Sequence, residues 1–204
     1  MLNLEYFTGG NSSVLHGNLK DGKKYKLWTF QSITSVKELK TTGILEVSWD
    51  RYVKTSAFYK SYQWMVKQLA ARAILCNDHA PIWAWHSCRK YHNPPTLLDA
   101  RCLLSDIEII NGIQTIEFEC PVELAVLSSY GEWNRLLYEY FHNTEQIEID
   151  KESVDWLFQV ERNKFRIDDS IQATLPFLML DWVIGIRDLN LKPNDFTYNE
   201  EEKV

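Results

Sequence analysis

Three ring side chains stand close together in the middle of the sequence, at Trp83, Trp85 and His86. If this segment is a strand, the two indoles lie on one face, because successive side chains of a strand alternate. Indole rings stack on flat ligands such as a nucleobase or a nicotinamide ring, and the nearby Arg89 has the charge that binds a phosphate. The segment therefore predicts either a pocket for a planar, phosphorylated ligand or a buried aromatic layer under a helix.

Cysteine and histidine occur on both sides of this segment. Cys76 and His79 precede it, and Cys88 and His92 follow it. Thiolate and imidazole groups at such spacings are typical zinc ligands. A strand over 82–87 would separate the two pairs by about 20 Å, at a rise of roughly 3.3 Å per residue. Buried thiols and surface imidazoles are the alternative interpretation, and no metal is expected outside these four weak candidates.

Carboxylates form a further group on a predicted hairpin. The hairpin covers residues 101–120, and Asn111-Gly112 would supply its tight turn. One face of it would carry Asp106, Glu108, Glu117 and Glu119. Like charges on one face either bind a divalent cation or lie in water.

The bulk composition is that of an ordinary globular protein. The chain has 204 residues, of which 45% are hydrophobic and 25% charged, which suits one domain with a full-sized core. The formal net charge of −6 argues against long nucleic acids as partners. No apolar run reaches the length of about 18 residues that a membrane span needs. Because the chain has four cysteines and no signal peptide, we expect reduced thiols and a cytoplasmic protein.

Local patterns predict an α+β fold. Alternation over 25–31 predicts a strand, and a Ser35–Glu38 capping box would start the next helix, which Gly43 would end. Apolar stripes predict helices near 58–73, 129–140 and 153–161, and apolar runs predict strands at 82–87, 171–178 and 180–187. Helices segregated from runs of strands indicate a single α+β domain over 25–191, with helices packed on a bent mixed or antiparallel sheet. Residues 1–24 are predicted as an N-terminal extension and 192–204 as a polar C-terminal tail.

Several short motifs resemble those of one uncharacterised protein family. They are Leu27-Trp28-Thr29-Phe30-Gln31-Ser32, Tyr62-Gln63-Trp64-Met65 with Arg72, Trp83-Ala84-Trp85-His86, Leu127-Ser128-Ser129 with Trp133, and Ile171-Gln172-Ala173-Thr174. On these motifs the chain is identified as a member of a bacterial and phage family of domains of unknown function, over residues 26–191. Membership implies no assigned chemistry.

The first strand and the helix after it also resemble, more distantly, the first elements of the ADP-ribosyltransferase fold. That resemblance implies a cleft in which the first strand holds the ribose of NAD, here with Trp28 and Thr29. The ring that stacks on the nicotinamide would be Tyr62 or Trp85, and Gln172-x-Thr174 would replace the usual glutamate motif. Threonine cannot supply the negative charge that stabilises the positive charge developing on the ribose. The resemblance therefore implies NAD or nucleotide binding with weak or lost catalysis.

Two functions from different classes follow. The leading hypothesis is a nucleotide- or NAD-binding domain, and its cleft candidates are Trp28, Thr29, Gln31, Tyr62, Trp85, His86, Arg89, Gln172 and Thr174. The alternative is a non-catalytic protein-interaction module of a bacterial or phage conflict system. A cleft where Trp28, His86 and Gln172 converge would favour the first hypothesis. An exposed aromatic patch without concavity would favour the second.

Overall fold

The computed structural model describes residues 22–142, 148–160 and 170–189. Most of the predicted N-terminal extension (1–24) and all of the predicted tail (192–204) lie outside these ranges. Within the described ranges, no helix combines the length and the apolar character that crossing a lipid bilayer requires.

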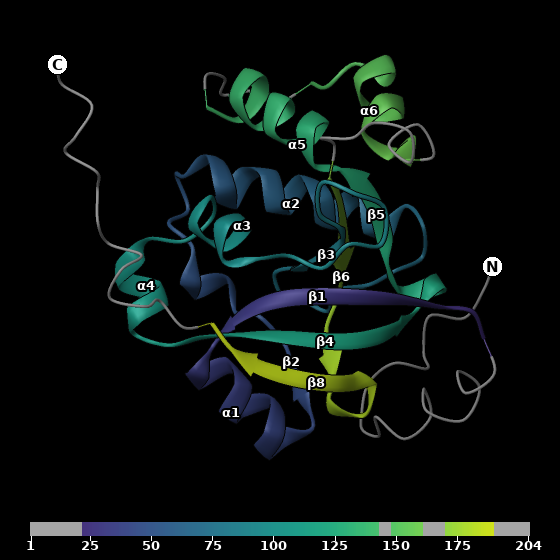
Figure 1. Cartoon of the computed structure of the whole chain (residues 1–204). Coiled ribbons are helices and arrows are strands. Elements are labelled where there is room, and N and C mark those ends of the chain that lie inside the picture. Colours follow the sequence, from purple (N-terminus) through teal and green to yellow (C-terminus); the bar gives the residue numbers. More distant parts are fainter. Residues whose placement is uncertain (1–21, 143–147, 161–169, 190–204) are drawn as a thin grey trace, which may run out of the picture.

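A six-stranded antiparallel sheet forms the centre of the molecule (Figure 1). In spatial order its strands are β5 (Val126–Ser129), β6 (Ile171–Leu175), β3 (Ile82–Ser87), β1 (Lys24–Ser32), β4 (Ile113–Pro121) and β8 (Val183–Asp188). A second sheet pairs β2 (Ile44–Leu45) with β7 (Leu178–Met179). The predicted α+β class is confirmed, and β3 has the bounds predicted for it. The strand predicted over 171–178 is two strands, β6 and β7, which belong to different sheets.

The helix α1 (Ile33–Thr42) covers one face of the sheet. Its residues Val36 and Leu39 share a core cluster with Leu27 of β1 and Phe118 of β4. Gly43 ends the helix at a φ of 81°, as predicted, because only glycine adopts this left-handed conformation without strain. The predicted start is wrong by one turn. Ser32, not Ser35, is the N-cap, and its hydroxyl accepts a hydrogen bond from the backbone N–H of Ser35.

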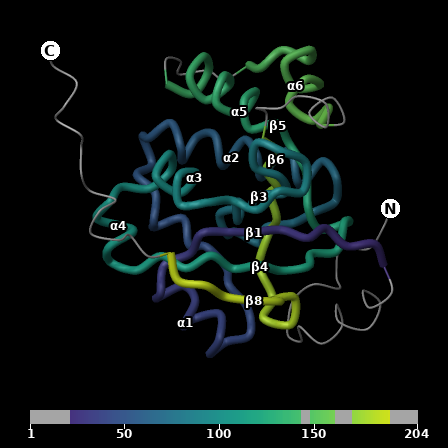
Figure 2. The backbone as a smooth tube through the Cα atoms, in the orientation of Figure 1, coloured from purple at the N-terminus to yellow at the C-terminus, as the bar shows by residue number. Residues whose placement is uncertain are grey.

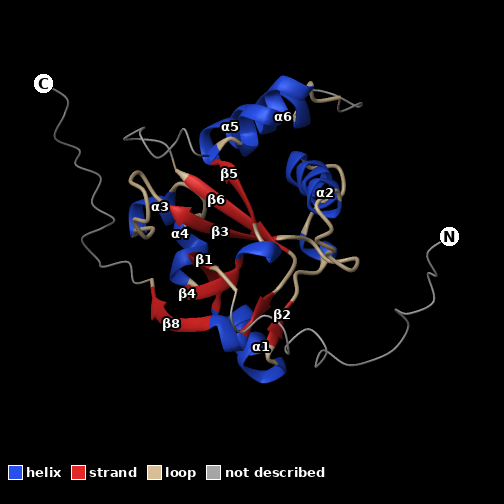
Figure 3. Cartoon of the chain, turned by 90° about the vertical axis from the view of Figure 1, so that its right-hand side faces the viewer, coloured by secondary structure: helices blue, strands red, loops and turns tan. Residues whose placement is uncertain are grey.

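Further helices pack beside β3, β6 and β5. They are α2 (Ala57–Ala70), α5 (Tyr130–Leu136) and α6 (Lys151–Phe158). Figure 3 shows α5 and α6 near the β5 edge of the sheet, whereas α1 lies near the β8 edge. Met65, Trp133 and Leu157, one from each helix, meet in a second core cluster. Short turns of 3-10 helix occupy Trp49–Arg51, Val122–Leu124 and Leu180–Trp182, and a π-helical turn covers Leu137–Phe141.

The hairpin predicted over 101–120 is wrong in its first half. Two short helices, α3 (Leu97–Arg101) and α4 (Asp106–Ile110), replace the first strand, and only β4 is extended. The cause is a capping box at Ser105 and Glu108, in which each side chain accepts a hydrogen bond from the backbone N–H of the other residue. Asn111-Gly112 therefore ends a helix. The α4 helix lies at the end of the sheet where β4 begins and β8 ends (Figure 2).

Candidate functional site

The strands β1, β3 and β6 place three of the cleft candidates in one row. Trp28 lies opposite Trp85, and Trp85 lies opposite Gln172, in consecutive antiparallel pairs. Directly opposite residues share a sheet face, so three segments distant in the sequence lie side by side. Thr174 lies on the same face of β6, two positions after Gln172, and Tyr62 of α2 reaches this face at Trp83, with ring centroids 5.1 Å apart.

These side chains are buried rather than arranged around an open cleft. Trp28, Trp85 and Gln172 are only 3%, 7% and 5% exposed. Tyr130 of α5 covers Trp85, with ring centroids 4.8 Å apart. The amide of Gln172 is used internally, because its Nε2 donates a hydrogen bond to Ser128 Oγ at 3.1 Å. Burial raises the pKa of the Tyr62 phenol well above its ordinary value, so this group stays neutral.

Two buried polar atoms on this face, Trp83 Nε1 and Thr174 Oγ1, have no hydrogen-bond partner within the described residues. The indole of Trp28 lies opposite Glu117, and its hydrogen bond helps to lower the pKa of that carboxyl group. A buried polar group without a partner costs about 1–3 kcal/mol. A ligand or a water molecule with a free acceptor would satisfy the indole N–H of Trp83. This is the one feature of the row that suits a binding site better than a core.

Three other cleft candidates lie away from the row. Thr29 and Gln31 alternate with Trp28 along β1 and so lie on the opposite face. The Thr29 hydroxyl donates a hydrogen bond to the Trp83 carbonyl at 2.8 Å, and Gln31 Nε2 donates to the Thr29 hydroxyl at 3.0 Å. His86 packs edge-on against Tyr25, with ring centroids 5.5 Å apart, and its Nδ1 lies 2.8 Å from Ser87 Oγ. His86 therefore does not converge with Trp28 and Gln172.

Arg89 lies in the loop that follows β3. Its backbone has a φ of 61°, and its guanidinium forms an ion pair with Asp99 at 3.1 Å. The ion pair with Asp99 holds the positive charge of Arg89 near the start of α3. Arg89 therefore helps to position α3 beside the sheet and is not directed at the Trp28–Gln172 row.

The four metal-ligand candidates do not form a site. Within the described ranges, no three His, Cys, Asp or Glu side chains gather as a metal-binding group. Cys76 and Cys88 belong to different core clusters. Burial raises the pKa of the Cys76 thiol to about 11 and that of Cys88 further, which disfavours the thiolate that a metal needs. His79 Nδ1 lies 3.6 Å from Glu46 Oε1, and His92 packs on His86.

The four carboxylates of the predicted hairpin do not share a face. Asp106 and Glu108 belong to α4, whereas Glu117 and Glu119 belong to β4. Glu117 Oε1 lies 2.6 Å from the Lys26 ammonium. The hydrogen bond from Lys26 is the largest cause of the lowered pKa of the Glu117 carboxyl group. Glu119 pairs with Lys24 and Asp106 pairs with Arg101. Cations from the chain itself thus neutralise three of the four carboxylates.

The structure exposes an aliphatic surface that the sequence analysis missed. We call it the α3–α4 surface, and its members are Ile33 (38% exposed), Leu98 (55%), Leu103 (47%), Ile107 (70%) and Ile110 (62%). The backbone N–H of Ile33 donates to the Gly112 carbonyl, which places the start of α1 beside the end of α4. An Arg101–Asp106 ion pair at 3.2 Å joins α3 to α4.

The inner sides of the same two helices are already part of the core. Ala100, Ile109 and Ile113 form a buried cluster with Leu97 and Leu104 packed against it. The helices are thus apolar on both sides, a pattern that normally accompanies burial on both sides. The sequence signal was three aliphatic doublets, Leu97-Leu98, Leu103-Leu104 and Ile109-Ile110, in which one residue points inward and its neighbour outward.

Residues 26–151 match the family model described as "Domain of unknown function (DUF3841)". The chain belongs to the DUF3841 family. The DUF3841 match includes all five residues of the α3–α4 surface and ends before Gln172 and Thr174. No curated protein and no solved structure matches the chain significantly.

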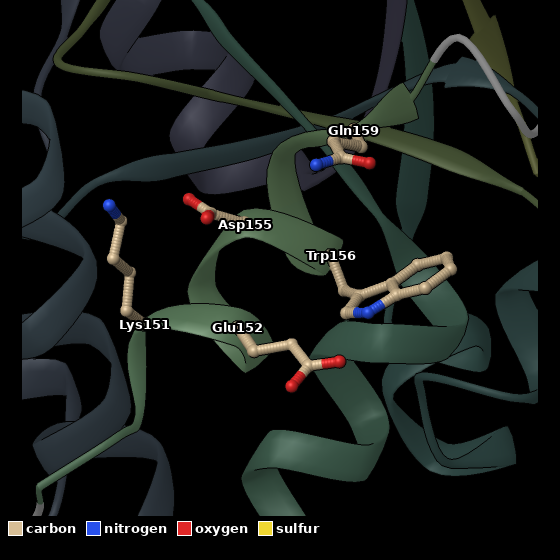
Figure 4. Close-up of a pocket in the computed structure, with 5 residues that line it drawn as sticks. All are labelled: Lys151, Glu152, Asp155, Trp156 and Gln159. Carbon is tan, nitrogen blue, oxygen red and sulfur yellow. The ribbon is translucent and has the colours of Figure 1, made fainter.

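A hollow of about 430 Å³ lies against α6 in this DUF3841 member (Figure 4). It is lined by Lys151, Glu152, Asp155, Trp156 and Gln159. None of the nine cleft candidates lines it. Its lining carries one basic and two acidic side chains on a single helix. The excess of negative charge disfavours a phosphate.

Proposed function

We propose that this chain is a protein-binding module and that the α3–α4 surface contacts its partner. The observation that carries the proposal is the exposure of five aliphatic side chains on elements whose inner sides already pack in the core. Exposed apolar patches of this kind mark protein contact sites in soluble proteins. This surface lies wholly within the residues that the family model matches.

The energetics fit a specific contact. Fully burying an exposed Leu or Ile side chain contributes about 1.5–3 kcal/mol. These five side chains are 38–70% exposed, so covering them contributes about 1 kcal/mol each. The ion pairs Arg101–Asp106 and Arg89–Asp99 supply polar groups on the same helices, as in interfaces with an apolar centre and a polar rim. We propose a partner that presents aliphatic or aromatic side chains, as a non-catalytic component of a bacterial or phage conflict system.

The experiment compares proteins that co-purify with tagged full-length variants from the native host. The test variant is Ile107→Ser with Ile110→Ser, and the matched control is Ile184→Ser, which changes a 55% exposed isoleucine on β8. We expect the double variant, and not the control, to lose one or more proteins that the wild type retains. Identical retention by all three, or retention by none, would overturn the proposal. Circular dichroism checks that each variant is folded.

A second candidate function is binding of a planar ligand, such as a nucleobase or the nicotinamide ring of NAD. It is favoured by the indole N–H of Trp83, which has no partner within the described residues and lies on the sheet face that carries Gln172. Because Tyr130 covers Trp85, binding would require Tyr130 to move. A thermal-shift titration with NAD, nicotinamide and adenosine tests it. Stabilisation that Gln172→Leu abolishes supports ligand binding, and no shift with any of the three compounds contradicts it.

A further inference from the structure

The strand β8 forms one edge of the central sheet, and among the described strands it pairs with β4 alone (Figure 1). Just after β8, the backbone N–H of Leu189 donates to the Ile113 carbonyl at 2.9 Å. Opposite residues of antiparallel strands alternate between hydrogen-bonded and non-hydrogen-bonded pairs. Counting back from Leu189, the backbone N–H and C=O groups of Asp188 and Ile186 therefore point away from β4. These groups form one side of a ladder that a further strand would complete.

The two faces of β8 differ at this edge. Ile186 lies opposite the fully buried Ile116 and is itself half-buried against the core cluster, so an apolar row ends at the edge. Gly185 and Arg187 lie on the other face, because side chains alternate along a strand. Gly185 lies opposite Glu117, and a Cβ built on it would meet no atom within 4 Å. The Arg187 side chain is 64% exposed, and its Nη2 lies 3.1 Å from Glu117 Oε2.

A second copy of β8 fits this edge. In an antiparallel pair with a two-fold axis at Ile186, the outward N–H and C=O groups of the two Ile186 residues bond to each other. On the core face, the row of Ile116 and Ile186 then continues across the axis. On the other face, Arg187 of each copy lies opposite Gly185 of the other copy, and no side chain separates it from Glu117 of that copy. Opposite charges on neighbouring strands stabilise a contact of this kind.

Other registers of the same pair are less favourable. A shift of the pairing by one residue sets outward-pointing backbone groups opposite inward-pointing ones, so the ladder is lost. A register centred on Arg187 sets the two guanidinium groups directly opposite each other, which is destabilising. A register centred on Gly185 takes Arg187 out of the row that holds Glu117 of the other copy. Hydrogen bonding, apolar contact and charge therefore agree on the register centred on Ile186.

We infer that β8 pairs with β8 of a second copy of this chain, so that the two central sheets become one sheet across a two-fold axis. Such an axis requires the same surface of both copies, as this register does. The inference is independent of the proposed function, because none of the five residues of the α3–α4 surface belongs to β8. A contact of one short strand from each copy is smaller than the roughly 800 Å² per partner of a standard interface. We therefore expect a reversible dimer whose formation depends on concentration.

Sedimentation velocity of the full chain over about 1–200 μM, where weak contacts dissociate, measures the equilibrium between monomer and dimer. Ile186→Pro removes the outward N–H at the axis and keeps the hydrogen bonds to β4, and proline is tolerated at such edge positions. Ile186→Ala is the matched control, because it loses the same packing and keeps the N–H. We expect Ile186→Pro to raise the dimer Kd at least about tenfold above that of Ile186→Ala, because two hydrogen bonds across the axis are lost. A wild type that stays monomeric throughout, or equal Kd values for the two variants, would overturn the inference.

A cross-linking experiment tests the register without proline. In a Cys102→Ser background, which removes the exposed native thiol, Gly185→Cys and Arg187→Cys are prepared as separate chains. Oxidised glutathione should cross-link a mixture of the two chains at least about tenfold faster than either chain alone, because only the mixture places two thiols directly opposite each other. A mixture that reacts no faster than the separate chains would refute the register and with it the inference. Circular dichroism checks that every variant is folded.

Discussion

Gly112 joins α4 to β4 and sets where the α3–α4 surface lies. Its φ is 104°, a backbone conformation that side chains with a Cβ rarely adopt. A Cβ at this position would lie 2.9 Å from Ile33 Cγ1 and closer still to Ile33 Cδ1. The Gly112→Ala variant therefore meets two separate costs, one from the backbone and one from the start of α1.

The magnitude follows from those two costs. Holding an alanine at positive φ costs about 1–2 kcal/mol. Ile33 is 38% exposed and can rotate away, and an off-rotamer side chain costs about 0.5–1.5 kcal/mol. We expect Gly112→Ala to lower the free energy of unfolding by about 2–3 kcal/mol, combining the conformational and rotamer costs. Urea denaturation followed by tryptophan fluorescence measures this change.

A double-mutant cycle separates the two costs. In an Ile33→Ala background the contact with the new Cβ is removed and the positive φ remains. Gly112→Ala should then cost about 1 kcal/mol less than in the wild type, which corresponds to the rotamer cost. A Gly112→Ala change below about 0.5 kcal/mol, the usual range for neutral surface substitutions, would refute the reasoning. Equal costs in the two backgrounds would refute the role of Ile33.

Three further predictions concern other parts of the molecule. Gln172→Leu leaves Ser128 Oγ buried without its donor, so urea denaturation should show a loss of about 1–3 kcal/mol; stability equal to the wild type would contradict the internal role of this amide. Asp150 caps α6, and its hydrogen bonds to Ser153 lower its pKa from 3.8 to about 2. The cap is therefore present above about pH 4, the ordinary aspartate pKa, and is lost as the pH falls towards 2; amide exchange in α6 should rise over that interval in the wild type and not in Asp150→Asn. Iodoacetamide at pH 8 should modify the exposed Cys102 in the native protein well before the three buried cysteines. The reason is that burial raises the pKa of the Cys76 thiol to about 11 and that of the Cys120 thiol to about 12. Equal modification rates for all four cysteines in mass spectrometry would contradict the burial of Cys76, Cys88 and Cys120.

Local sequence signals predicted some elements correctly where no neighbouring signal favoured a different structure. The strand Ile82–Ser87 and the stop at Gly43 are examples, since a compact apolar run and a left-handed glycine have few alternatives. The Ser105–Glu108 capping box is equally local, yet the Asn111-Gly112 turn signal next to it pointed to a hairpin. Where two local signals favour different structures, tertiary packing determines which one forms. Here Ile109 and Ile113 are buried in one cluster, which favours the helix α4 over a hairpin strand.

Candidate-site residues were harder to predict than elements, because a site depends on strand pairing over long distances. The motifs at Trp28, Trp85 and Gln172 were visible in the sequence, but their register across three strands was not. Alternation alone also leaves open which face is covered. The α3–α4 surface was missed for a different reason. A strand was expected over the first half of 101–120, and the exposed sides of the helices α3 and α4 exist only because this segment is helical.

Hydrogen exchange at the backbone amides of 97–110 tests the central claim most directly. The purified full chain is measured alone and with a protein that it captures, after removal of all other host components. The α3–α4 surface as a contact site predicts exchange at least tenfold slower over α3 and α4 in the complex, with α2 unchanged. Slower exchange confined to α2, α6 or the Trp28–Gln172 row, with α3 and α4 unchanged, would contradict it.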